Sequence, residues 1–177
     1  MGYLDQPDIL LTWDEVREGG QEGVRRFIRA RELDRPTGDG RFDAQLSTIE
    51  WDVVGAWAER AFAKHRGVPW NPLDRPDRYR EKRDVDGWDV KGSSYDPAHL
   101  IVPLSCKPKD RFVLLCGWLQ HWRIAGWFTG KQCHATGTTR VQCGKGGNYA
   151  YWIPDNELND WPPRLPAPFL DVSGLQP

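Results

Sequence analysis

The chain has 177 residues, of which 39% are hydrophobic and 28% charged, and its formal net charge at pH 7 is −1. This length and composition fit one globular domain with a buried core and exclude a disordered chain. No run of about 18 apolar residues occurs, and the first residues lack the basic start and apolar stretch of a signal peptide. We therefore expect a cytoplasmic protein without a membrane partner, with a single domain over 1–160 and a proline-rich extended tail over 161–177.

The N-terminal third carries helical signals. Thr12-Trp-Asp-Glu15 has the form of a capping box, which predicts the start of a helix. Glycines at positions 19, 20 and 23 weaken helical propensity, so we expect them to interrupt this helix and 24–33 to form a second one.

The strongest helical pattern follows a second capping box at 47–50 and runs from Ile49 to Arg66, where Gly67 and Pro69 should stop it. At 100° per residue, one broad apolar arc is formed by Val54, Trp57, Ala58, Ala61 and Phe62. Glu59 falls at the edge of that arc, on the boundary of the core. Its ordinary interpretation is a boundary glutamate without a function.

The second half of the chain is predicted to form short strands. Apolar and β-branched runs bounded by turn residues lie at 99–104, 111–117, 121–128 and 149–154. Between 129 and 148 no clear period is present, and 154–160 suits a helical turn. Helices followed by strands predict an α+β fold, with a mixed, mostly antiparallel sheet flanked by the N-terminal helices over 1–66 and the strands over 84–154.

One short segment, 84–91, holds three aspartates and a lysine within eight residues. Its Asp86-Gly87 pair is the dipeptide favoured in two-residue hairpin turns, because both central residues must accept positive φ. If the turn lies there, Asp84 is opposite Asp89. Side chains alternate along a strand, so Lys91 shares the face of Asp89.

Like charges directly opposite on paired strands are destabilising, so this hairpin calls for a compensating cation. Lys91 supplies part of the compensation, and Mg²⁺ would supply more, since it takes one or two carboxylates together with water and phosphate oxygens. That arrangement suits metal-assisted hydrolysis of a phosphodiester. The plainer alternative is a surface hairpin with an Asp–Lys ion pair.

Two basic stretches flank the acidic segment. Residues 60–83 carry a formal charge of +5 and 107–145 carry +6, whereas 84–106 carry −3. A positive rim around a negative centre suits a protein that approaches a polyanion while it holds a cation, although charge runs of this size also occur on solvated faces. The predicted nucleic-acid contacts are Lys107, Lys109, Arg123 and Lys131.

An acidic residue, a short hairpin and then Asp-x-Lys resemble the signature of the PD-(D/E)xK, or restriction-endonuclease-like, superfamily, with Asp84 and Asp89-Val90-Lys91 in those places. The helix GAWAERAFAKHRG, with Glu59, is similar to the preceding helix of that superfamily, which often adds a glutamate to the site. The strand pattern also resembles a group of small nuclease-like proteins of phages and bacteria. The resemblance spans residues 47 to 160.

This resemblance implies a restriction-endonuclease-like core and hydrolysis of DNA with Mg²⁺, or with Mn²⁺ in its place. It implies that Asp84, Asp89 and Glu59 hold or support the metal and that Lys91 assists catalysis, with Asp86 in reserve for Asp84. Two departures stand out: segment 104–110 is too short for the helix expected after the third strand, and Arg83 stands in place of proline. The alternative is an inactive nuclease-like fold that binds nucleic acid or a host defence protein.

Four cysteines are too few for a disulfide framework in a chain of this size, and we expect free thiols. Cys106 and Cys116, and again Cys133 and Cys143, are separated by nine residues, whereas structural zinc favours ligand pairs two to four residues apart. Zinc is therefore disfavoured. Its one remaining ligand set would be Cys133, His134, Cys143 and His121.

Overall fold

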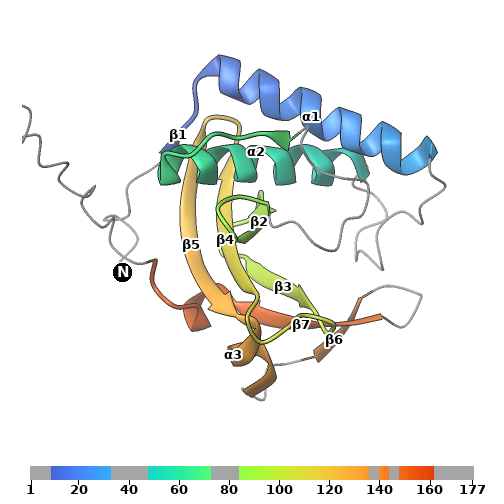
Figure 1. Cartoon of the computed structure of the whole chain (residues 1–177), viewed down its shortest axis with the longest axis vertical. Coiled ribbons are helices and arrows are strands. Elements are labelled where there is room, and N and C mark those ends of the chain that lie inside the picture. Colours follow the sequence, from blue (N-terminus) through green and yellow to red (C-terminus); the bar gives the residue numbers. More distant parts are fainter. Residues whose placement is uncertain (1–8, 33–47, 73–83, 136–139, 144–147, 162–177) are drawn as a thin grey trace, which may run out of the picture.

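The computed structural model describes residues 9–32, 48–72, 84–135, 140–143 and 148–161. Two helices, α1 (Trp13–Glu32) and α2 (Thr48–Arg66), lie side by side, and α2 lies between α1 and a four-stranded sheet (Figure 1). The strands of this sheet, in spatial order, are β1 (Ile9–Leu10), β5 (His121–Thr129), β4 (Arg111–Trp118) and β2 (Asp89–Ser93).

A second sheet packs on the opposite face of the first. Its strands, in spatial order, are β3 (His99–Pro103), β7 (Asn148–Pro154) and β6 (Arg140–Cys143). Between the described strands, β2 and β4 form a parallel pair and the other pairs are antiparallel. The predicted α+β class with a mixed, mostly antiparallel sheet is confirmed, while the division into two sheets was not predicted.

The two predicted N-terminal helices are one continuous helix, so that prediction was wrong. The capping box that begins it is confirmed: the N–H of Thr12 donates to Glu15 at 2.7 Å, and the N–H of Glu15 donates to the Thr12 hydroxyl at 3.2 Å. Gly23 does not interrupt α1 but lets it approach α2, since a Cβ there would lie 2.4 Å from the Cα of Val53. Close packing of the two helices therefore outweighs the poor helical propensity of glycine.

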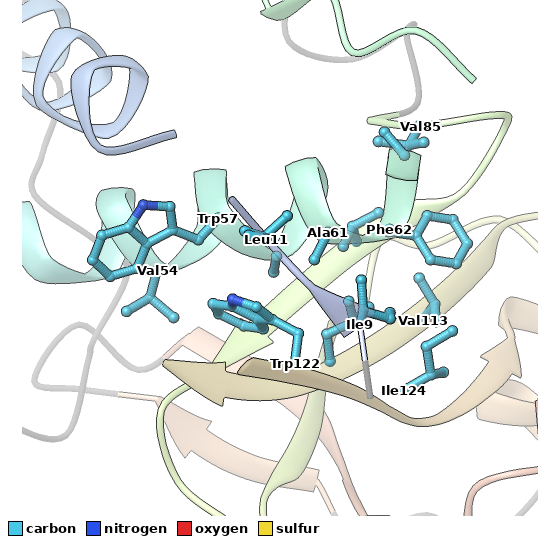
Figure 2. Packing of buried hydrophobic residues seen from close by; sticks show 14 of the residues in the cluster. Ile9, Leu11, Val54, Trp57, Ala61, Phe62, Val85, Val113, Trp122 and Ile124 are labelled. Atoms are coloured by element: carbon cyan, nitrogen blue, oxygen red, sulfur yellow. The ribbon is translucent and has the colours of Figure 1, made fainter. Parts of the chain in front are cut away.

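The predicted apolar arc of α2 is confirmed and faces the four-stranded sheet (Figure 2). Val54, Trp57 and Phe62 are buried against residues of β4 and β5 such as Val113 and Trp122. The helix ends at Arg66, and Gly67 follows with φ of 66°. This conformation favours glycine and explains why the helix stops there.

The segment between 129 and 148, in which no clear period is present, contains α3 (Gly130–Ala135) and β6. The predicted helical turn near 154–160 is the 3-10 helix η2 (Asp155–Glu157). A second core fills the space between the two sheets and includes residues of β3, β4, β5, β7 and α3. Nearly all of the predicted tail lies outside the described residues, and none of the described helices is long and apolar enough to cross a membrane.

Candidate functional site

The predicted turn before β2 is present. Asp86 and Gly87 have φ of 48° and 78°, and Val85 forms a bridge with Trp88 across the turn. The buried ring of Trp88 stacks under the guanidinium of Arg111, which lies 4.9 Å from the ring centroid. The turn is therefore anchored to the start of β4 by an aromatic residue and a cation–π contact.

Asp84, Asp89 and Lys91 meet at the beginning of β2, which is the edge strand of its sheet among the described strands. The amine of Lys91 lies 2.8 Å from Oδ1 of Asp89. Asp84 reaches across the turn, and its Oδ2 accepts a hydrogen bond from the N–H of Val90 at 2.9 Å. All three charged side chains are half-buried, which strengthens their interactions compared with those on an open surface.

The pKa of Lys91 depends on its burial and on the acids around it. Burial alone would lower its pKa, but the carboxylates of Asp89, Asp84 and Glu59 outweigh burial and raise the pKa above its ordinary value. Lys91 is therefore a cation at neutral pH. The structure thus brings Asp84, Asp89 and Lys91 together at the start of β2, whereas Glu59, on α2, acts on Lys91 only through its charge.

Asp86, the predicted reserve for Asp84, belongs to a different contact. Its Oδ2 accepts hydrogen bonds from Nε and Nη2 of Arg66 at 3.0 and 2.7 Å. Arg66 is the last residue of α2, so this exposed ion pair joins the helix end to the tip of the turn. Asp84, and not Asp86, is thus the acid of the turn that reaches β2, where it accepts a hydrogen bond from the N–H of Val90.

Glu59 is buried, with 4% of its surface exposed, and not merely at the boundary of the core. Its two carboxylate oxygens accept hydrogen bonds from Nη1 and Nη2 of Arg26 in α1, at 2.8 and 2.7 Å. The Nε of Arg26 donates to Glu22 at 2.7 Å. Burial alone would lower the pKa of Arg26, but hydrogen bonds and charge from these two glutamates raise it. Arg26 was not predicted as part of the site, because its four-residue spacing from Glu22 suggests only a pair within the helix.

The donor set fits Mg²⁺ in part. Asp84 and Asp89 provide the two carboxylates that this ion commonly takes in proteins, and Oδ1 of Asp89 is buried without a well-directed hydrogen bond, although Lys91 lies beside it. Both oxygens of Glu59 accept hydrogen bonds from Arg26, so a metal ion there would compete with a guanidinium for the same carboxylate. Among the described residues, no group of three or more acidic, histidine or cysteine side chains is arranged to hold a metal.

Three of the four predicted nucleic-acid contacts gather on one surface. The turn before β4 and the first turn of α3 are joined by backbone hydrogen bonds, including one of 2.9 Å from the N–H of Lys131 to the carbonyl of Pro108. Asp89 is in register with Phe112, so this surface lies at the same end of the sheet as the start of β2. Its exposed lysines are Lys107, Lys109 and Lys131.

The fourth predicted contact, Arg123, lies elsewhere on β5. It is in register with Cys116, and its guanidinium forms ion pairs with Asp96 and Asp155. The side chain is only 18% exposed. Arg123 therefore ties the segment after β2 and the start of η2 to the sheet, and this structural role accounts for its position.

The cysteine and histidine that lie in contact, Cys106 and His134, are not the set considered for zinc from the sequence. Sγ of Cys106 lies 3.4 Å from Nε2 of His134, and burial raises the pKa of Cys133 to about 12. His121, at the start of β5, lies at the opposite end of that strand from α3. Cys106, Cys116 and Cys133 are buried free thiols, as predicted; the side chain of Cys143 lies outside the described part.

No family model matches this chain, and comparisons with curated proteins and with solved structures gave no match.

Proposed function

We propose that this protein is a metal-dependent nuclease that hydrolyses phosphodiester bonds of DNA and has a restriction-endonuclease-like core. The observation that carries the proposal is the meeting of two carboxylates and an amine at the start of β2: Lys91 lies 2.8 Å from Oδ1 of Asp89, and Asp84 is held across the turn by the N–H of Val90. A half-buried lysine among acids on the edge strand of the described sheet supports chemistry on a charged substrate more readily than a role in stability.

Asp84 and Asp89 would hold Mg²⁺, with Mn²⁺ as a substitute. When bound, the ion supplies a more acidic water and neutralises charge on the phosphate. The hydrogen bond from the N–H of Val90 to Asp84 fixes the direction of that carboxylate. Asp89 is oriented by its contact with Lys91, at 2.8 Å. These two contacts would pre-arrange the acids before substrate arrives.

Lys91 is assigned the role of a cation rather than of a base: without a bound metal, the acids around it raise its pKa and favour the protonated amine. A protonated amine beside the scissile phosphate stabilises the negative charge that develops in the transition state. The deprotonated amine would be needed for the other role considered from the sequence, removal of a proton from water. Stabilisation of charge is therefore the role that the surroundings of Lys91 support.

Substrate would approach along the surface formed by Lys107, Lys109 and Lys131, all exposed and at the same end of the sheet as Asp89. Lysines of this kind bind phosphates without reading sequence. We expect binding to DNA that depends strongly on salt and little on base sequence.

The direct test is cleavage of plasmid and linear DNA in Mg²⁺ or Mn²⁺ by the wild type and by Asp89→Ala and Lys91→Ala variants. We expect the wild type to cleave DNA and each variant to cleave it at least about 100-fold more slowly, as for removal of a group that stabilises transition-state charge. Asp86→Ala is the matched control, because this acid lies on the same turn but pairs with Arg66. Equal products from the wild type, Asp89→Ala and Lys91→Ala would reject the nuclease.

A second candidate is an inactive nuclease-like fold that binds nucleic acid or a host protein. It is favoured by the commitment of both Glu59 oxygens to Arg26, which leaves two acids for a metal. Calorimetric titration with Mg²⁺ separates the candidates, since a pure binding protein has no need of the ion. Heat of binding that disappears in Asp89→Ala supports the enzyme, whereas no heat with the wild type supports the binding protein.

A further inference from the structure

A chain of buried charges connects α1 to the candidate site. It runs from Glu22 through Arg26 to Glu59, with hydrogen bonds of 2.7 to 2.8 Å at each step. The Arg26 and Glu59 side chains are 14% and 5% exposed, so the contact is largely removed from water. Glu59 follows Ala58, whose Cβ would lie 2.7 Å from a Cβ at Gly92, so it adjoins the strand that carries Asp89 and Lys91.

The geometry of this contact is specific. A planar guanidinium that donates two parallel hydrogen bonds fixes both the distance and the orientation of a carboxylate, which a lysine cannot do. The third donor of Arg26, Nε, is held by Glu22, so the arginine is itself fixed from the other side. Glu59 is therefore held in a single direction by a residue that lies 33 positions earlier in the chain.

A direct contact between Arg26 and phosphate does not suit this geometry. The three nitrogens of the guanidinium already face carboxylates, and little of the side chain reaches the surface. An arginine that binds DNA would need its donors free toward the solvent. The effect of Arg26 must pass through Glu59.

We propose that Arg26 is a positioning residue of the nuclease site. It fixes the direction of the Glu59 carboxylate beside β2 and keeps Glu59 out of the direct metal ligands, so that Asp84 and Asp89 alone would hold the ion. This inference rests on the proposed function and deepens it: it assigns α1 a part in the site and reduces the metal ligands from three acids to two.

The experiment compares Arg26→Gln and Arg26→Lys with Arg60→Gln. Arg60 is the matched control, because it also joins α2 to α1, through Glu15 at 2.9 Å, without belonging to the site. We expect Arg26→Gln to lower kcat about 10- to 100-fold, the range found for residues that orient a metal or catalytic site, with KM for DNA within about twofold. Arg60→Gln should keep the kcat of the wild type. Urea unfolding shows that each variant is folded under assay conditions.

A second measurement needs no catalysis. Calorimetry with Mg²⁺ alone should give a Kd for Glu59→Gln within about threefold of the wild type, whereas Asp89→Asn should weaken binding at least about tenfold. The double variant Arg26→Gln/Glu59→Gln should be no slower than the slower single variant, because both changes remove the same contact.

Each result bears on the proposal. It is overturned by an unchanged kcat in Arg26→Gln, by a raised KM with a smaller salt slope, which indicates a phosphate contact, or by loss of Mg²⁺ binding in Glu59→Gln. If Arg26→Gln does not fold, Arg26→Lys decides: a lowered kcat in the folded protein supports positioning, and the wild-type kcat rejects it. A wild type that cleaves no DNA overturns the proposed function, whereas cleavage that is indifferent to Arg26 overturns this inference alone.

Discussion

At the scale of single residues, the site depends on a position that has no side chain. Gly92 follows Lys91 in β2 and faces α2, where a Cβ would lie 2.7 Å from the Cβ of Ala58 and 2.8 Å from the carbonyl oxygen of Val54. This close approach brings the strand that carries Asp89 and Lys91 against the helix that carries Glu59. The absence of a Cβ at Gly92 is thus part of what assembles the charged group.

Gly92→Ala should therefore destabilise the protein by about 1–3 kcal/mol, the usual effect of overpacking, because the backbone of α2 must move. The matched change is Gly55→Ala, also on this interface helix, where a Cβ meets nothing within 4 Å and helical propensity improves. That variant should gain up to about 1 kcal/mol. Urea unfolding measures both, and equal effects of the two substitutions would show that Gly92 is not packed as described.

At the scale of elements, α1 connects the helical layer to the site. Its Gly19 and Gly23 face α2, and its Arg26 reaches Glu59 one turn after Gly23. The helix does more than shield α2 from solvent, because it supplies Arg26, the partner of the buried Glu59. A displacement of α1 changes the surroundings of Glu59 as well as the stability of the fold.

Gly23→Ala should lower both stability and cleavage, since its Cβ would lie 2.4 Å from the Cα of Val53 and would push α1 and Arg26 away from α2. Gly20→Ala is the control within the same helix: its nearest neighbour is an ordinary contact at 3.9 Å. It should keep full activity and gain up to about 1 kcal/mol of stability. Unfolding curves and cleavage rates of the two variants test this, and a Gly23→Ala protein with wild-type stability would contradict the close packing.

At the scale of the whole molecule, charge is distributed unevenly although the net charge is only −1. Acids and Lys91 lie at the start of β2, and exposed lysines lie on the turn before β4 and on α3, at the same end of the sheet. The proposed binding to DNA therefore depends on this local surface and not on the total charge.

Replacing Lys107, Lys109 and Lys131 together by alanine should reduce the slope of log affinity against log salt by about 3, since each phosphate contact contributes about 0.9. Affinity should fall similarly for unrelated DNA sequences. Arg17→Ala is the control, because Arg17 is an exposed residue of α1 paired with Asp14. Fluorescence titrations at several salt concentrations measure the slope. A slope unchanged by the triple substitution would place the DNA surface elsewhere.

The local features of the fold were predictable from the sequence because each depends on neighbours in the chain. Positive φ at Asp86 and Gly87 follows from the preference of one dipeptide. The buried arc of α2 follows from a 3.6-residue period, and its end follows from Gly67. For the same reason the sequence alone placed Asp84, Asp89 and Lys91 together across a single turn.

Only the tertiary structure decided the rest, because it depends on residues distant in the chain. The parallel pairing of β2 with β4, the division into two sheets and the continuity of α1 through its glycines come from packing between elements. The bond from Arg26 to Glu59 spans 33 positions and has no local pattern. The sequence thus determined which charges the turn carries. Tertiary packing decided which buried charges, such as that of Glu59, are paired, since burial makes an unpaired charge costly.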